Sequence, residues 1–305
     1  IAINGVTGKT GVTENSTPQS VTITISENES SPTVTLTSSA SSIAENSGST
    51  ITLTATISQV ADEDVTVNLG AAGSSTNGTD YGSLSSITVS AGATTGTATF
   101  DPTDDSVYEG NETAVISISS VSGADATESG SQSETITITE NDSSPTITLA
   151  SSASSIAENA GSSLTLTATS SIVADEDITV SISTTGTGTE GTDYSTISDI
   201  TISAGQTTGT ASFTPTDDSV FEGNETGIVA ISGVSGADAA ESGSQSVTIT
   251  ITDNETTAPK VTLSTSATSI AENAGSSLTL TATLSVATTA DVTVELSTSG
   301  TATEG

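Results

Sequence analysis

The chain contains no cysteine, histidine, methionine or tryptophan, and its only basic residues are Lys9 and Lys260. Without cysteine it can form no disulfide, no thiolate nucleophile and no Cys-ligated zinc site. Without histidine it lacks the usual general base and the commonest transition-metal ligand. With two cationic side chains it cannot neutralise the phosphates of nucleic acid or attract an anionic membrane surface, so neither is expected as a partner.

Long apolar runs and aromatic residues are also scarce. No run approaches the length of a transmembrane helix, so no membrane insertion is expected in this segment. Aromatic residues make up only 2% of the 305 residues, so any core must be built mainly from Val, Ile, Leu and Ala. Such thin cores favour small β domains over one large globule, and the length allows about two to three ordinary domains.

Negative charge is abundant instead, with 37 Asp and Glu residues and a net charge of −35. Scattered acidic residues need no explanation beyond solubility. Two segments are different, because Asp104–Glu112 and Asp217–Glu225 each place four carboxylates within nine residues, with no basic residue nearby. These carboxylates repel one another unless a cation neutralises them, so the clusters predict a bound metal ion.

The sequence repeats itself with a period of 113 residues, which separates Glu45 from Glu158 and Glu109 from Glu222. The repeat predicts four segments: 1–30 as the C-terminal part of a preceding repeat, 31–143 and 144–257 as complete repeats, and 258–305 as the N-terminal part of a following repeat. We interpret the chain as a window from a longer tandem array.

Each complete repeat alternates polar and apolar residues with a period of two, and none of its segments has a sustained helical period. In the first repeat this predicts strands near Thr33–Leu36, Thr50–Ile57, Val65–Leu69, Ser86–Val89, Gly96–Phe100, Ala114–Ser119 and Glu134–Thr139. Seven short strands in about 110 residues are typical of an immunoglobulin-like sandwich. The fold class predicted is therefore all-β, with seven-stranded antiparallel sandwiches arranged end to end.

Three motifs of the second repeat, Thr189–Tyr194, Asp217–Glu225 and Val247–Glu255, together resemble the Calx-β domain. The resemblance spans the whole repeat, recurs in the first repeat and extends into both flanking segments, as in bacterial extracellular, adhesin-like repeat proteins. It implies a seven-stranded sandwich whose loops at one end bind Ca²⁺.

The resemblance also implies the ligands, because the motif positions can be carried over residue by residue. In the first repeat they are Glu45, Asp80, Asp104, Asp105, Glu109, Glu112, Glu140 and Asp142, and in the second Glu158, Asp193, Asp217, Asp218, Glu222, Glu225, Asp253 and Glu255. Only Glu27, Glu29 and Glu272 remain in the partial segments. Carboxylates alone also favour Ca²⁺ on chemical grounds, since Ca²⁺ takes six to eight oxygens in flexible geometry whereas Mg²⁺ demands a tight octahedron.

The chain departs from the family pattern in two places. Asn141 and Asn254 interrupt the acidic tail of each repeat, and Thr-Ala and Thr-Gly follow Glu112 and Glu225 where the family usually has an aromatic residue. We therefore expect a lighter core and a calcium dissociation constant of roughly 0.1–1 mM, as in extracellular modules.

The leading functional hypothesis is a calcium-stabilised structural repeat that forms a stalk or filament of a secreted or cell-surface protein, in adhesion or matrix. Its expected partners are neighbouring repeats of the same protein, with possible self-assembly into filaments. Two alternatives are a regulatory calcium-sensing module and the spacer of an adhesin whose binding head lies outside this chain. No enzymatic activity and no catalytic residue are expected, because a glycosidase cleft would need more aromatic platforms than three Tyr and three Phe supply.

Overall fold

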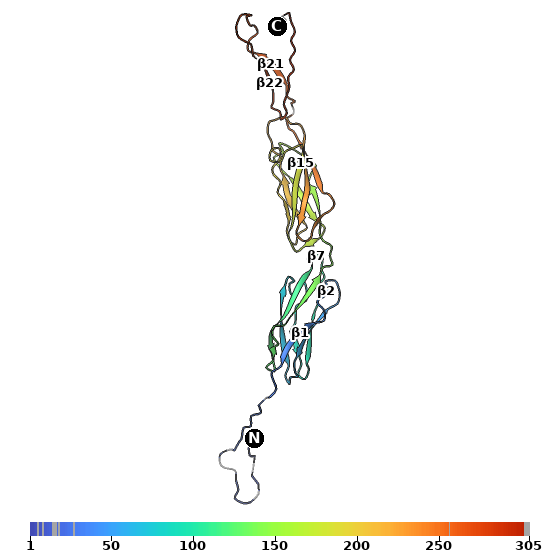
Figure 1. Cartoon of the computed structure of the whole chain (residues 1–305), viewed down its shortest axis with the longest axis vertical. Helices are drawn as coiled ribbons and strands as arrows, with labels where there is room; N and C mark the ends of the chain where they lie inside the picture. The colour runs from blue at the N-terminus through green and yellow to red at the C-terminus, as the bar shows by residue number, and fades with distance from the viewer. Residues whose placement is uncertain are drawn as a thin grey trace. The chain divides into compact units, whose positions relative to one another are not determined.

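The computed structural model describes residues 1–301 apart from 5, 8, 14–16, 18, 27 and 256 (Figure 1). Glu27, the linker residue Thr256 and the last four residues of the predicted segment 258–305 therefore lie outside the described residues. Within those ranges the regular structure consists of strands, and no helix long and apolar enough to cross a membrane is found.

The first complete repeat is built from a four-stranded sheet, in the order β6-β3-β1-β9, and a five-stranded sheet, in the order β2-β10-β8-β4-β5. Alternation along the strands gives each sheet one buried face, as in β3, where every second residue from Ile51 to Ile57 is buried. The strands are β1 Thr33–Ser38, β2 Ser42–Ala44, β3 Ile51–Ile57, β4 Val65–Gly73, β5 Ile87–Val89, β6 Thr95–Phe100, β7 Val107–Tyr108, β8 Glu112–Ser122, β9 Thr127–Glu128 and β10 Ser133–Thr139.

The second complete repeat has the same topology, with sheet orders β17-β13-β11-β19 and β12-β20-β18-β15-β16. Its strands are β11 Thr146–Ser151, β12 Ser155–Ala157, β13 Leu164–Ser170, β14 Val173–Ala174, β15 Ile178–Gly186, β16 Ile200–Ile202, β17 Thr208–Phe213, β18 Glu225–Ser235, β19 Ala240–Glu241 and β20 Ser246–Thr252. The predicted all-β sandwich is confirmed.

The prediction of a purely antiparallel, seven-stranded unit is right for the long strands and wrong at the edges. β9 pairs in parallel with β1, and β2 pairs in parallel with β10. β19 and β12 repeat both pairings in the second repeat. These edge strands are two or three residues long, too short for a period of two to show in the sequence, and such short edges limit pairing with other chains.

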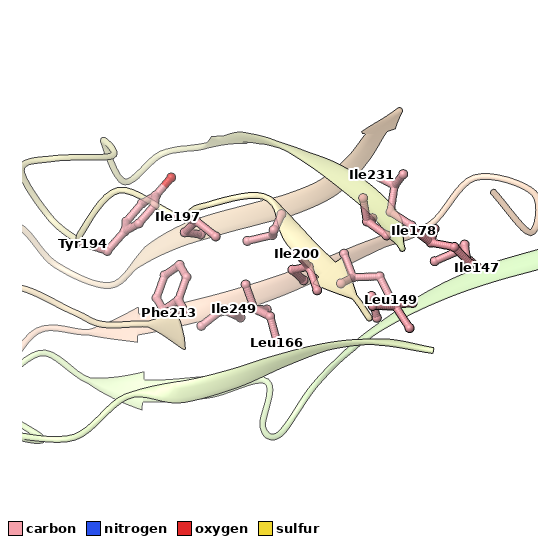
Figure 2. Close-up of a cluster of buried hydrophobic side chains, with 14 of the residues drawn as sticks. Ile147, Leu149, Leu166, Ile178, Tyr194, Ile197, Ile200, Phe213, Ile231 and Ile249 are labelled. Atoms are coloured by element: carbon pink, nitrogen blue, oxygen red, sulfur yellow. The ribbon is translucent and has the colours of Figure 1, made fainter. Parts of the chain in front are cut away.

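The core of the second repeat fills the space between its two sheets with Ile, Leu and one aromatic pair (Figure 2). The rings of Tyr194 and Phe213 stack with centroids 4.6 Å apart. Gly227, in the Thr-Gly pair that departs from the family pattern, lies against this pair, and a Cβ there would come within 2.8 Å of the Phe213 ring. The missing aromatic residue is thus explained, because Phe213 occupies the space. In the first repeat Tyr81 and Phe100 stack in the same way, with centroids 4.5 Å apart.

The described chain divides into two compact units that do not coincide with the sequence repeats. The first comprises Ile1–Ser41, Ser49–Asp101 and Ala114–Ile136, and the second comprises Ser42–Gly48, Pro102–Thr113 and Thr137–Gly305. The second unit therefore contains the acidic loop of the first repeat together with all of the second repeat. It also contains an antiparallel hairpin of β21 Val261–Thr265 and β22 Leu280–Leu284.

Candidate metal centre

In the second repeat, carboxylates from four separate segments converge. Glu158 directly follows β12, Asp193 lies in the loop between β15 and β16, and Asp253 and Glu255 follow β20. The acidic loop between β17 and β18 adds the remaining members, Asp218, Glu222 and Glu225. Loops at one end of a sandwich are brought together by the strands, so residues 97 positions apart in sequence can share one site.

Three groups of these side chains place carboxylate oxygens within 4.8 Å of one another: Glu158, Asp218 and Glu222; Glu158, Asp253 and Glu255; and Asp193, Glu222 and Glu225. Glu158 and Glu222 each belong to two groups, so the three groups form one continuous cluster. Two carboxylates about 4 Å apart repel by roughly 1 kcal/mol in water and by several times that near a protein surface. A divalent cation in the cluster would turn this repulsion into attraction.

Backbone donors hold the acidic loop against the end of β20. Asp253 Oδ2 accepts hydrogen bonds from the N–H groups of Glu222 (3.1 Å) and Gly223 (2.6 Å), and Oδ1 accepts from the N–H of Glu255 (2.8 Å). Burial of Asp253 opposes ionisation, but these backbone donors outweigh it and hold the pKa of its carboxyl below the usual range. Asp253 is therefore an anion that fixes the loop before any metal binds.

Other carboxyls in the cluster have the opposite shift. Burial, with the negative charge of Asp193 next in size, raises the pKa of Glu225 to about 7. Burial also raises the pKa values of Glu158 and Glu222. Glu158 is only 6% exposed, and it accepts a hydrogen bond from the N–H of Asp218 (3.1 Å). A raised pKa means that these carboxyls hold their protons more tightly than usual, and a bound cation would displace those protons.

Two oxygens of the acidic tail point to a ligand more directly. Within the part of the chain that the structure describes, Oδ1 of Asn254 and Oε2 of Glu255 are buried and have no hydrogen-bond partner. A buried acceptor without a donor is costly, and it is rare in folded proteins unless water or an ion satisfies it. These oxygens fit a hard cation, which needs acceptors and no donors. Asn254 lowers the negative charge of the tail, but its buried Oδ1 is itself a candidate ligand atom for a cation.

The first repeat builds the same loop from different carboxylates. Glu140 accepts four backbone N–H groups: Oε2 takes those of Glu109 (2.7 Å) and Gly110 (3.0 Å), and Oε1 takes those of Asn141 and Asp142, both at 2.7 Å. Oδ2 of Asp142 is buried and, among the described residues, has no hydrogen-bond partner. The tail of the first repeat therefore also combines one loop-fixing anion with one unsatisfied oxygen.

Glu45 is the counterpart of Glu158. It is 5% exposed, and its Oε1 accepts a hydrogen bond from the N–H of Asp105 (3.3 Å). Burial raises the pKa of Glu45 to about 7, and the charges of Glu140 and Asp105 add to the shift. Burying a carboxylate among other carboxylates in this way is costly without a cation.

The remaining predicted residues lie in different surroundings. Asp80 lies in the first compact unit, is 8% exposed and accepts a hydrogen bond from the N–H of Thr76. Asp104 and Asp217, the first members of the two Asp-Asp pairs, are exposed and belong to none of the grouped sets within the described residues. Glu29 and Glu272 are exposed in the partial segments. Ligation by the predicted residues stays a prediction.

The sequence interpretation missed two asparagines that shape the loop. Oδ1 of Asn111 accepts the N–H of Glu140 (3.0 Å), and Oδ1 of Asn224 accepts the N–H of Asp253 (3.3 Å). Their recurrence at the same place in both acidic loops was the available signal. The loop thus accepts a hydrogen bond from the residue after the last strand, and the carboxylate of that residue accepts hydrogen bonds from the loop N–H groups.

It also missed Tyr108, which stands between the carboxylates of the first acidic loop. β7 pairs in parallel with β14 of the second repeat, where the Asp175 N–H donates to the carbonyl of Tyr108 (3.2 Å). The Tyr108 hydroxyl donates to Oδ2 of Asp238 (2.9 Å), and its ring, 7% exposed, belongs to the core cluster of the second repeat. The loop that carries the candidate ligands of one repeat is therefore packed into the next.

Each of the two complete repeats is similar to a known domain family. Residues 140–255 match the Calx-beta domain profile, and residues 31–143 match the profile of the LapA domain. No curated protein matches the sequence of the chain significantly.

Solved structures similar to the chain include CBD12 from CALX1.2, with 15% identity over 69% of this chain and 96% of that chain and a TM-score of 0.32. The apo-form Calx CBD1 domain has 18% identity over 36% of this chain and 98% of that chain, with a TM-score of 0.31. The Yersinia pseudotuberculosis adhesin InvE has 14% identity over 72% of this chain and 58% of that chain, with a TM-score of 0.32.

Proposed function

We propose, from the match of residues 140–255 to the Calx-beta domain, that this chain is a calcium-stabilised structural repeat module. In this proposal the repeats form part of a stalk or filament of a secreted or cell-surface protein, acting in adhesion or matrix. Their partners are the neighbouring repeats of the same protein, and the stalk can serve as the spacer of an adhesin head.

The observation that carries the proposal is the continuous carboxylate cluster of the second repeat with its unsatisfied buried oxygens. Glu158, Asp218, Glu222 and Glu255 would hold the ion, with Asp193 and Glu225 at the far side of the cluster. The donor set contains oxygen only and more carboxylates than one small octahedral ion needs, which favours Ca²⁺ over Mg²⁺. The ion supplies positive charge, and no catalytic step is assigned to it.

The role of this ion follows from what the acidic loop of the first repeat carries. Asp105 and Glu109 flank Tyr108, so the residues that would respond to Ca²⁺ lie one to three positions from the side chain that contacts the second repeat. An ion bound at the loop would fix its backbone and hold Tyr108 in its place against Asp238. Without the ion, repulsion among the carboxylates would loosen the loop and with it the junction.

The energetic scale is large for a domain with so thin a core. At a Ca²⁺ concentration one hundred times the dissociation constant, one site adds about 2.7 kcal/mol to the free energy of unfolding. Domains of this size have total stabilities of about 5–15 kcal/mol. Calcium would therefore decide whether such repeats stay folded in a dilute extracellular environment.

The test is thermal unfolding and calorimetric titration of the full chain with Ca²⁺, using a matched pair of variants. Glu222→Gln removes a charge that belongs to two of the carboxylate groups, whereas Asp217→Asn removes one from the same loop that belongs to none. We expect Glu222→Gln to weaken Ca²⁺ binding by at least tenfold and Asp217→Asn to change it little.

Three results would count against the proposal. An unfolding midpoint that does not change with chelator contradicts a structural role for Ca²⁺. Equal effects of Glu222→Gln and Asp217→Asn contradict the site. A micromolar dissociation constant would instead support the regulatory calcium-sensing alternative, since structural extracellular modules bind at about 0.1–1 mM.

A further inference from the structure

The junction within the second compact unit shows how a repeat receives the loop of its predecessor. The receiving surface consists of two segments, Val173–Glu176 and Gly236–Ala239. Of these residues, Asp175, Glu176 and Gly236–Ala239 line a cavity of about 600 Å³ together with Tyr108. β14 supplies backbone pairing, and Asp238 supplies the acceptor for the tyrosine hydroxyl. We call these two segments the receiving surface of the second repeat.

The first repeat has the same surface 113 residues earlier, at Val60–Glu63 and Gly123–Ala126, and its backbone has the same unusual conformation. Ala124 and Asp125 have φ values of 53° and 50°, and their counterparts Ala237 and Asp238 have 50° and 47°. Two successive non-glycine residues in the left-handed region are uncommon and are retained where the surroundings enforce them. Their recurrence shows that the shape is built into the repeat and does not require an occupant.

Hydrogen bonds reproduce this shape in both repeats. The N–H of Ala124 donates to Oε2 of Glu63 (3.4 Å), as that of Ala237 does to Oε2 of Glu176 (3.2 Å). The carbonyl of Ala61 accepts the N–H of Gly92 (2.9 Å), matching the bond between Ala174 and Gly205 at 2.8 Å. The surface of the first repeat is therefore preformed, and binding there needs little rearrangement.

The two surfaces differ in what covers them. Val60 is 60% exposed, whereas its counterpart Val173 is half-buried, and Ala124 is half-buried where Ala237 is buried. Within the described residues of the first compact unit, an open cavity of about 510 Å³ is lined by Glu63, Val121–Ala126 and no aromatic side chain. The apolar contact made by Tyr108 in the second repeat has no equivalent there.

We propose that this surface, Val60–Glu63 with Gly123–Ala126, binds the acidic aromatic loop of another repeat of the same kind. The occupant is a segment with the chemistry of residues 102–113, whose Val-Tyr pair adds a short parallel strand and inserts the tyrosine ring. The inference goes beyond the proposed calcium role and rests on the Tyr108 junction alone.

The surface also selects for tyrosine. Asp125 occupies the place of Asp238, so it offers a carboxylate acceptor to an incoming hydroxyl. A phenylalanine loop, like the one that carries Phe221, has no hydroxyl to donate and would bury the ring without satisfying Asp125. Loss of a hydrogen bond to a charged group is expected to weaken binding by about tenfold.

The experiment titrates the full chain, in Ca²⁺, with a synthetic peptide of residues 102–113, and follows backbone amide signals by NMR. Peptide is added up to about 5 mM, in the range of effective concentrations that a short tether supplies. We expect shifts at Ala61, Asp62 and Gly123–Ala126, and none at Asp175 or Asp238, where Tyr108 is already bound. The same peptide with Phe in place of Tyr should bind about tenfold more weakly.

Two variants make the result decisive. Tyr108→Ala vacates the receiving surface of the second repeat, so the peptide should then shift both surfaces. Asp125→Gly removes the carboxylate at a position where glycine tolerates the positive φ, and it should abolish the preference for the Tyr peptide. Shifts at the second repeat alone, shifts elsewhere, or no shifts at all would each overturn the proposal. A chain that responds to chelator but not to peptide would leave the calcium proposal standing.

Discussion

The acidic tails of the two repeats carry Asp and Glu at the same two positions but in reverse order. The first repeat has Glu140 and Asp142, and the second has Asp253 and Glu255. In both, the first carboxylate accepts hydrogen bonds from backbone N–H groups of the acidic loop and of its own tail. In both, the second carboxylate keeps a buried oxygen that has no hydrogen-bond partner among the described residues. The position in the acidic tail, and not the length of the side chain, therefore decides which carboxylate holds the acidic loop and which keeps an oxygen for a ligand.

The comparison extends to the aromatic residue of each loop. Tyr108 donates a side-chain hydrogen bond to Asp238, whereas the hydrogen bond of Phe221 runs from its backbone N–H to the carbonyl of Ala287 (3.1 Å). Both residues form a short parallel bridge to the segment that follows. The backbone part of the junction is thus shared, and the hydroxyl distinguishes the two loops.

The largest effect on stability is expected from substitution of the buried glutamate of each site, which tests whether the two sites are equivalent. Glu45→Gln and Glu158→Gln should each lower the free energy of unfolding in saturating Ca²⁺ by up to about 2.7 kcal/mol, the contribution of a site at one hundred times its dissociation constant. In chelator the same variants should stabilise the chain, because a buried charge is removed. Thermal melts under both conditions check the sign, and destabilisation in chelator would contradict the site.

The next effect separates the two cores. Gly227→Ala places a Cβ about where the Phe213 ring already lies, and the resulting overpacking should destabilise the second repeat by about 1–3 kcal/mol. The first repeat already has Ala114 at this position. Exchange of Ala114 for glycine serves as the control, which should cost about 1 kcal/mol or less. Denaturant unfolding measures both, and an unchanged midpoint for Gly227→Ala would show that Phe213 moves freely.

A smaller effect distinguishes the aromatic residues of the loops. Tyr108→Phe removes the hydrogen bond to Asp238 and should cost about 1 kcal/mol. Phe221→Tyr adds a hydroxyl to a half-buried loop side chain, so it should change the stability by less than about 0.5 kcal/mol. Differential scanning calorimetry of the two variants checks this order, which a purely apolar junction would not produce.

A separate effect is a pH dependence of the calcium-free chain. The pKa values of Glu45 and Glu225 are raised to about 7, so the folded state binds more protons than the unfolded state between about pH 4.5 and 7. The stabilisation is complete below the unfolded pKa and is lost as the pH rises through about 7. The thermal unfolding midpoint measured in chelator should therefore be lower at pH 8 than at pH 5. In saturating Ca²⁺ the fall should disappear, because the ion holds these carboxylates ionised.

Much of the fold was predictable from alternation, and much of the site was not. The long strands β3 and β20 have a clean period of two, but β7 is two residues long and is defined by its partner in the next repeat. Asp217 matches the family motif as well as Asp218 does, yet only Asp218 joins a carboxylate group within the described residues. Sequence spacing alone does not specify the direction of a side chain in an irregular loop, so the motif cannot tell which of two adjacent carboxylates joins the cluster.

The mismatch between the sequence repeats and the compact units has a consequence for how such a chain changes length. Pro102–Thr113 belongs to the first sequence repeat but to the second compact unit. The boundaries of the compact units therefore differ from the boundaries of the sequence repeats. Duplication of one period of 113 residues adds an acidic loop and a receiving surface at the same spacing as those already present. Recombination between the two similar repeats can therefore lengthen the chain without a new type of junction having to evolve.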